Sequence, residues 1–181
     1  MPGTVRARHY ATGQFVDIYF AAGLIQAIEP AASGDDLYIA PGFIDLQVNG
    51  YGGVDFGSSA LTVDDVMKIS HGLDRHGVTG YLPTITTNSF ETIAHALRTI
   101  DEACRARRSA EQRILGVHVE GPYISPVDGP RGAHPKQHCR APDWQEFQRW
   151  QEAAGGRIKL ITLSPEYSDC LLYTSPSPRD S

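Results

Sequence analysis

Hydrophobic and polar positions change their period along the chain, and the change divides it into two parts. Up to residue 40 the pattern favours short strands: positions 15–20 alternate, 21–23 turn, and 24–28 follow as another strand. We assign residues 1–40 to a small N-terminal β unit, part of a β-sandwich. From residue 41 strands and helices alternate, so residues 41–169 form a second region.

Four largely apolar strands and three helices are predicted in this second region. Strands are expected at 42–49, 78–85, 114–120 and 157–163. Thr62 with Asp65 forms a capping box before the first helix, Ser89 caps the second, and Asp143 begins the third. Such repeated βα units favour a parallel sheet with helices outside it. The predicted fold class is α/β, a partial (β/α)8 TIM-type barrel of about four βα units.

The third strand carries the most informative side chains. Alternation sends His118 and Glu120 to one face and two valines to the other. A carboxylate that ends a strand just before Gly121 and Pro122 stands where barrel enzymes place ligands. A carboxylate inside a protein is paired or binds a metal, so we expect Glu120 to do one or the other.

Two amides, Gln47 and Asn49, share a face at the end of the first predicted barrel strand. They should therefore point into the same mouth as Glu120. Amide oxygens are weak ligands for Zn²⁺-type ions, which argues against a metal ion bound at the end of this first strand. The plainer interpretation is that both amides simply fill polar space inside the sheet.

The motifs of the second region resemble one branch of the amidohydrolase superfamily, the N-acetylglucosamine-6-phosphate deacetylases. They are Pro41-Gly-Phe-Ile-Asp45, the segment 45–56, Gly116-Val-His-Val-Glu-Gly-Pro-Tyr-Ile124, Arg131-Gly-Ala-His-Pro135 and Leu163-Ser-Pro-Glu166. Many superfamily members carry His-x-His where this chain has Gln47 and Asn49.

This resemblance implies hydrolysis of the acetamide of N-acetylglucosamine 6-phosphate, with one divalent metal ion, Zn²⁺ or Fe²⁺. Glu120 matches the family's metal ligand, and Ala133 with His134 matches its substrate-contacting pair. His118 lies at the mouth without being a family ligand. The family's two histidine ligands and its catalytic aspartate come from later strands, so no catalytic residue is assigned. We expect an N-terminal fragment that is inactive and poorly soluble alone, from a parent that is a homodimer.

Two other interpretations remain open. One is an amidohydrolase that acts on a cyclic amide or a base, although such enzymes commonly keep His-x-His. The other is a non-catalytic module with a degenerate barrel.

The composition limits the binding partners and the cellular compartment that we expect for this protein. The net charge of −5 shows no basic excess, so neither nucleic acid nor an anionic membrane is an expected partner. The three cysteines have neither metal-type spacing nor an even count, which favours a reducing, cytoplasmic compartment. No secretory signal or membrane-spanning run is recognised. Residues 170–181 break the βα rhythm and match a translated transposon-type sequencing adapter, so we treat them as a non-native tail.

Overall fold

The computed structural model describes residues 2–167, and it divides the chain into two compact units, Met1–Gly42 and the part that starts at Phe43. The suspected adapter-derived tail, residues 170–181, lies outside the described residues. Among the described helices, none has both the length and the apolar character needed to cross a bilayer.

The N-terminal unit contains a four-stranded sheet in the order β3-β2-β1-β4. Strands β1 and β2 are antiparallel, as are β2 and β3, whereas β4 runs parallel to β1. Its strands are β1 (Gly3–His9), β2 (Phe15–Ala21), β3 (Leu24–Pro30) and β4 (Tyr38–Ile39). Alternation in β2 buries Val16 and Ile18. The sheet confirms the predicted β character of this part, and the sandwich stays a prediction.

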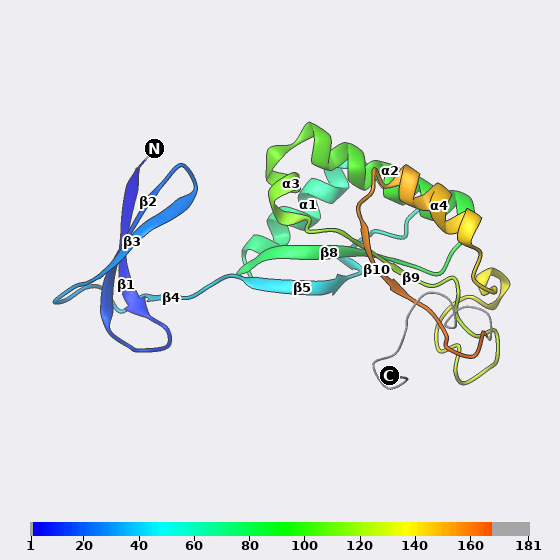
Figure 1. Ribbon diagram of the computed structural model, residues 1–181, viewed down its shortest axis with the longest axis horizontal. Coiled ribbons are helices and arrows are strands. Elements are labelled where there is room, and N and C mark those ends of the chain that lie inside the picture. Colours follow the sequence, from blue (N-terminus) through cyan, green and yellow to red (C-terminus); the bar gives the residue numbers. More distant parts are fainter. Residues whose placement is uncertain (1, 168–181) are drawn as a thin grey trace, which may run out of the picture. The chain divides into compact units, whose positions relative to one another are not determined.

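The second unit is built on a parallel sheet in the order β10-β9-β8-β5. Each strand of this sheet pairs with the strand of the same sheet that follows it along the chain. Helices α1, α2, α3 and α4 lie on one side of this sheet (Figure 1). The elements are β5 (Phe43–Val48), β6 (Gly50–Tyr51), β7 (Val54–Asp55), α1 (Val63–Asp74), β8 (Val78–Thr86), α2 (Phe90–Ala106), α3 (Arg108–Arg113), β9 (Val117–Glu120), the 3-10 turn η1 (Lys136–His138), α4 (Trp144–Ala153) and β10 (Ile158–Thr162).

Local sequence signals set the helix boundaries. Both hydrogen bonds of the predicted capping box form between Thr62 and Asp65, and the Ser89 and Asp143 side chains accept from Thr92 and Glu146 backbone N–H groups. These partners satisfy N–H groups that have no acceptor inside the helix. The three predicted helices and the four predicted strands are confirmed. The helix α3 and the β6–β7 hairpin were not predicted, because both are too short for a period to show.

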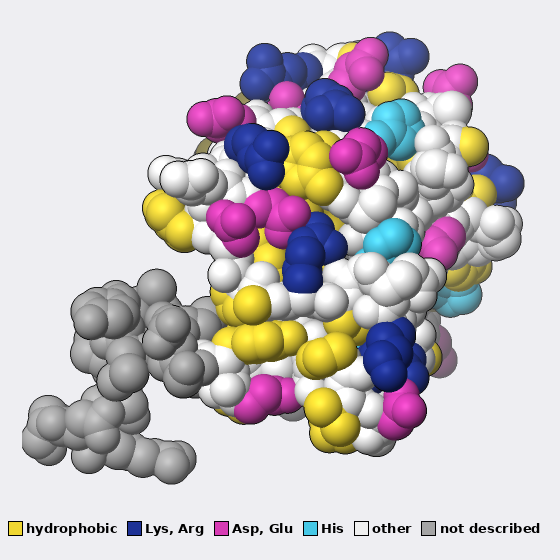
Figure 2. Space-filling view, turned by 90° about the vertical axis from the view of Figure 1, so that its right-hand side faces the viewer, with side chains coloured by type: hydrophobic (Ala, Val, Ile, Leu, Met, Phe, Trp, Pro, Cys, Tyr) yellow, Lys and Arg dark blue, Asp and Glu magenta, His cyan; other side chains and the backbone are white. Residues whose placement is uncertain are grey.

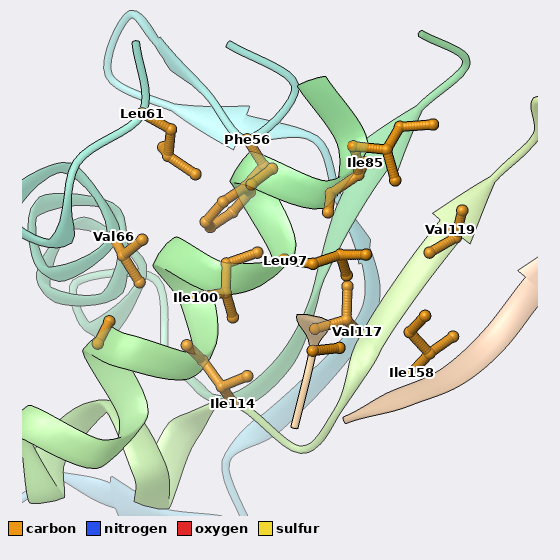
Figure 3. Close-up of a cluster of buried hydrophobic side chains, with 14 of the residues drawn as sticks. Phe56, Leu61, Val66, Ile85, Leu97, Ile100, Ile114, Val117, Val119 and Ile158 are labelled. Carbon is orange, nitrogen blue, oxygen red and sulfur yellow. The ribbon is translucent and has the colours of Figure 1, made fainter. Parts of the chain in front are cut away.

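The core lies between the helices and one face of the parallel sheet (Figure 3). Val117 and Val119 of β9 are fully buried there, with Ile85 of β8 and Leu97 and Ile100 of α2. The helix layer does not cover β5 to the same degree, since Ile44 and Leu46 are 62% and 60% exposed. The predicted α/β class with a parallel sheet is confirmed.

Candidate functional site

Glu120 ends β9 and lies half-buried at the carboxyl end of the parallel sheet. Its Oε2 atom accepts a hydrogen bond of 3.2 Å from Nε2 of Gln47 on β5. In the sheet, β8 lies between these two strands. The fold therefore brings together a carboxylate and an amide that are far apart in sequence, at the edge where parallel strands present their ends.

His118 lies two residues before Glu120 on β9, on the same face of the strand, and is 2% exposed. Its Nδ1 is 3.3 Å from Oγ1 of Thr84 on β8, and its Nε2 is 2.8 Å from Oγ1 of Thr162 on β10. Burial lowers the pKa of His118, and the nearby charge of Glu120 opposes that shift. The imidazole is thus held between hydroxyl groups of the two neighbouring strands, with both ring nitrogens occupied.

His134 comes from the long loop between β9 and α4 and reaches back to the end of β8. Its Nδ1 is 2.8 Å from Oγ1 of Thr87, and its backbone carbonyl accepts from Nη1 of Arg131 at 2.7 Å. The residue is half-buried, whereas its neighbour Ala133 is exposed. The loop therefore places Nδ1 of the His134 ring against Thr87 and holds the residue in a half-buried position.

Asn49 is the predicted site residue that the structure connects least to the others. The residue is exposed, and its backbone carbonyl accepts a hydrogen bond of 2.9 Å from the N–H of Phe56. Within residues 2–167, no hydrogen bond joins its side chain to Glu120 or Gln47. Its role at the mouth stays a prediction.

The described residues do not by themselves fit a catalytic metal. Within residues 2–167, no three His, Cys, Asp or Glu side chains are arranged to hold an ion. Glu120 would supply a single anionic oxygen, whereas catalytic zinc sites use three protein ligands. His118 does not add a second ligand, because both of its nitrogens face threonine hydroxyls.

Three threonines belong to this site and were missed by the sequence analysis: Thr84, Thr87 and Thr162. The sequence held a signal for Thr84 and Thr162, since the alternation of their strands places each on the same face of the sheet as His118. Threonine is common on strands, so its presence alone does not mark a site. Thr87 lies beyond the strand, and only the tertiary structure brings it to His134.

Charged side chains of both signs alternate over the face seen in Figure 2, and no basic patch gathers there. An open surface pocket of about 520 Å³ lies along α4, lined by Trp144, Phe147, Gln148, Gln151, Glu152, Gly155 and Gly156. None of the predicted site residues lines it.

The fold and these contacts define an α/β protein with polar side chains at the carboxyl ends of a parallel sheet. N-acetylglucosamine-6-phosphate deacetylase from Pasteurella multocida superposes with a TM-score of 0.75 at 26% identity, covering 93% of this chain and 46% of that one. The N-acetylglucosamine-6-phosphate deacetylase from Thermotoga maritima superposes with a TM-score of 0.67 at 28% identity. That match covers 82% of this chain and 39% of the Thermotoga maritima chain.

Curated relatives agree with the solved structures. The N-acetylglucosamine-6-phosphate deacetylases of Bacillus subtilis and Bos taurus are 37% and 38% identical over 133 and 131 residues. These alignments cover 72% and 71% of this chain but 33% and 31% of the relatives. No family model matches. The chain is a homologue of N-acetylglucosamine-6-phosphate deacetylases, which are hydrolases, and spans about one third of the length of the curated relatives it matches.

Proposed function

We propose that this chain is the N-terminal part of a metal-dependent N-acetylglucosamine-6-phosphate deacetylase. The whole protein would hydrolyse the acetamide of its phosphosugar substrate to glucosamine 6-phosphate and acetate. The observation that carries this proposal is the placement of Glu120 at the carboxyl end of β9, hydrogen-bonded to Gln47, in a chain whose relatives carry that name.

Glu120 is proposed as one ligand of the metal, and His134 with Ala133 as contacts for the substrate. The remaining ligands and the proton-transferring aspartate would come from later parts of the whole protein. When bound, a divalent ion would supply a polarising positive charge at the carboxyl end of the sheet. Gln47 would hold the Glu120 carboxylate in place, because its amide already donates to one carboxylate oxygen.

The sequential strand order supports a partial (β/α)8 barrel. Each strand pairs with its successor, and the connecting helices lie on one side, as in barrels of about 250 residues. Apolar side chains of β5 remain exposed on the face that buries Val48. A further helix from a complete barrel would cover them. The whole protein is proposed to be a cytoplasmic homodimer.

The test uses the protein encoded by the uninterrupted reading frame that continues this chain. Metal content and acetate release are measured for that protein and for its Glu120→Gln variant. We expect the variant to lose bound metal and most activity, because an amide replaces the anionic ligand. Asp45→Asn is the matched control, since this carboxylate accepts from the Gln47 backbone N–H instead. Unchanged metal content in Glu120→Gln would refute the ligand assignment.

The degenerate-barrel alternative makes a different prediction for the same protein. A non-catalytic module would release no acetate even with metal supplied. An amidohydrolase for a cyclic amide would turn over such a ring and leave the acetylated phosphosugar intact.

A further inference from the structure

Arg140 lies where the β9–α4 loop (residues 121–140) returns to the helices. Its backbone N–H donates a hydrogen bond of 3.0 Å to the carbonyl of Pro122, which stands two residues after Glu120. This bond closes the loop at its base, because it joins the first residues after β9 to the segment that leads into α4.

The guanidinium group of Arg140 extends this closure to two further elements. Its Nε and Nη2 atoms donate to the two carboxylate oxygens of Glu146 on α4, at 3.1 and 2.8 Å. Its Nη1 atom donates to the carbonyls of His138 at 2.8 Å and Asn88 at 3.4 Å. Asn88 belongs to the turn between β8 and α2, so one side chain connects that turn, the β9–α4 loop and α4.

The ion pair of Arg140 and Glu146 is partly shielded from water. The two side chains are 31% and 10% exposed, and Cζ of Arg140 lies 5.7 Å from the ring centre of the buried Trp150. A planar fork that meets both oxygens of a carboxylate fixes direction as well as distance. Removing one partner would leave the other charge partly buried without its counterion.

We propose that Arg140 is a positioning residue that keeps the β9–α4 loop closed at its base and thereby fixes the chain that leaves Glu120. The N–H of Gly121 is already held by the Thr162 carbonyl at 3.0 Å. Arg140 supplies the next fixed point along the chain, at Pro122. This inference rests on the proposed function, in which Glu120 belongs to the site.

Limited digestion with trypsin measures how often the loop opens. Cleavage in a folded protein follows local opening, provided that the opened segment closes again faster than it is cut. The loop contains two cleavage sites, after Arg131 and Lys136, and Arg98 within α2 provides a reference site for unfolding of the core. Mass spectrometry follows each site in the protein encoded by the uninterrupted reading frame that continues this chain.

Two variants should release the loop, and a third should not. Glu146→Gln should raise loop cleavage about tenfold relative to cleavage at Arg98, as expected when one hydrogen bond to a charged group is lost. Arg140→Lys should also raise it, because an ammonium cannot replace the fork. Asp74→Asn is the matched control, since Asp74 accepts from a fork of Arg113 at 2.8 and 2.9 Å but lies on α1. It should leave the ratio unchanged.

An unchanged ratio in Glu146→Gln would overturn the proposal, because a merely structural role would speed cleavage at the loop and at Arg98 together. A rise of the same size in Asp74→Asn would overturn it as well. If Arg140→Lys does not fold, Glu146→Gln still decides, since glutamine keeps the size of the side chain.

Kinetics of the whole protein test the consequence for the site. Glu146→Gln should raise KM for N-acetylglucosamine 6-phosphate more than it lowers kcat, and Asp74→Asn should change neither. An unchanged KM in a Glu146→Gln variant whose loop is cleaved faster would overturn the positioning role. Absence of acetate release from the unmodified protein would instead refute the proposed function, and the cleavage ratios would still decide whether Arg140 closes the loop.

Discussion

The Gln47 amide donates a hydrogen bond of 3.2 Å to the Glu120 carboxylate across 73 positions of sequence. The pair joins the first and third strands of the parallel sheet at their carboxyl ends. An amide partner orients a carboxylate but leaves its negative charge uncompensated. Glu120 is therefore free to interact with a cation, yet no other side chain of residues 2–167 completes a metal site around it.

We predict that the 181-residue chain alone neither retains a divalent ion nor releases acetate from N-acetylglucosamine 6-phosphate. One carboxylate is too few ligands, since catalytic sites normally use three. Elemental analysis after dialysis and an acetate assay check this, with the Bacillus subtilis deacetylase assayed in parallel. Robust metal-dependent turnover by the isolated chain would contradict the prediction.

Gly121→Ala should destabilise the chain strongly. Gly121 has φ of +83°, which costs a residue with a side chain roughly 1–3 kcal/mol, and an added Cβ would also collide with Oγ1 of Thr87. Gly129→Ala is the matched control in the same loop, because its φ is +98° and its surroundings are open. Urea unfolding should show the larger loss for Gly121→Ala, and equal losses would argue against the collision.

The two tryptophans of α4 should differ sharply in their contribution to stability. Trp150 is fully buried between the rings of Phe90 and Tyr123 and donates its Nε1–H to the Phe90 carbonyl. Trp150→Ala should cost about 3–5 kcal/mol of unfolding free energy. Trp144 is 65% exposed, so Trp144→Ala should cost far less. Similar losses in chemical denaturation would mean that the burial of Trp150 is wrong.

Stability should fall at alkaline pH because of Tyr81. Burial raises the pKa of this phenol to about 12, although its hydrogen bond with Ser70 opposes the shift. The unfolded chain releases the same proton near its ordinary value of about 10. Raising the pH through this window therefore favours unfolding, by roughly 2 kcal/mol at pH 12.

Unfolding free energies measured by urea at pH 9, 10 and 11 should fall progressively toward that loss. Tyr81→Phe should lower stability at pH 9, because a buried hydrogen bond is lost, but should reduce the dependence on pH. An equally steep fall in Tyr81→Phe would assign the effect to other groups.

The isolated chain should also self-associate through β5. Ile44 and Leu46 are exposed on this edge strand, and unpaired edges with apolar side chains favour pairing between chains. Leu46→Lys should reduce the apparent mass in light scattering at high concentration. Val127→Lys is the control, since Val127 is 60% exposed but lies in a loop. The idea fails if both variants act alike.

The sequence by itself determined the local elements of this protein. The capping residues Thr62, Ser89 and Asp143 located the starts of three helices, because these signals lie within a few neighbouring positions. Alternation in β9 also determined that Val117 and Val119 would face the core, since side chains of a strand alternate between faces. The motif around Glu120 indicated the family that the comparisons then supported.

Only the tertiary structure decided which of those side chains meet. It joined Gln47 to Glu120 and His134 to Thr87, and it left Asn49 outside the hydrogen bonds of the site. It also buried Trp150 and left Trp144 exposed on the same helix. The physical reason is that a local pattern fixes the direction of a side chain, whereas its partner depends on strand order and loop path.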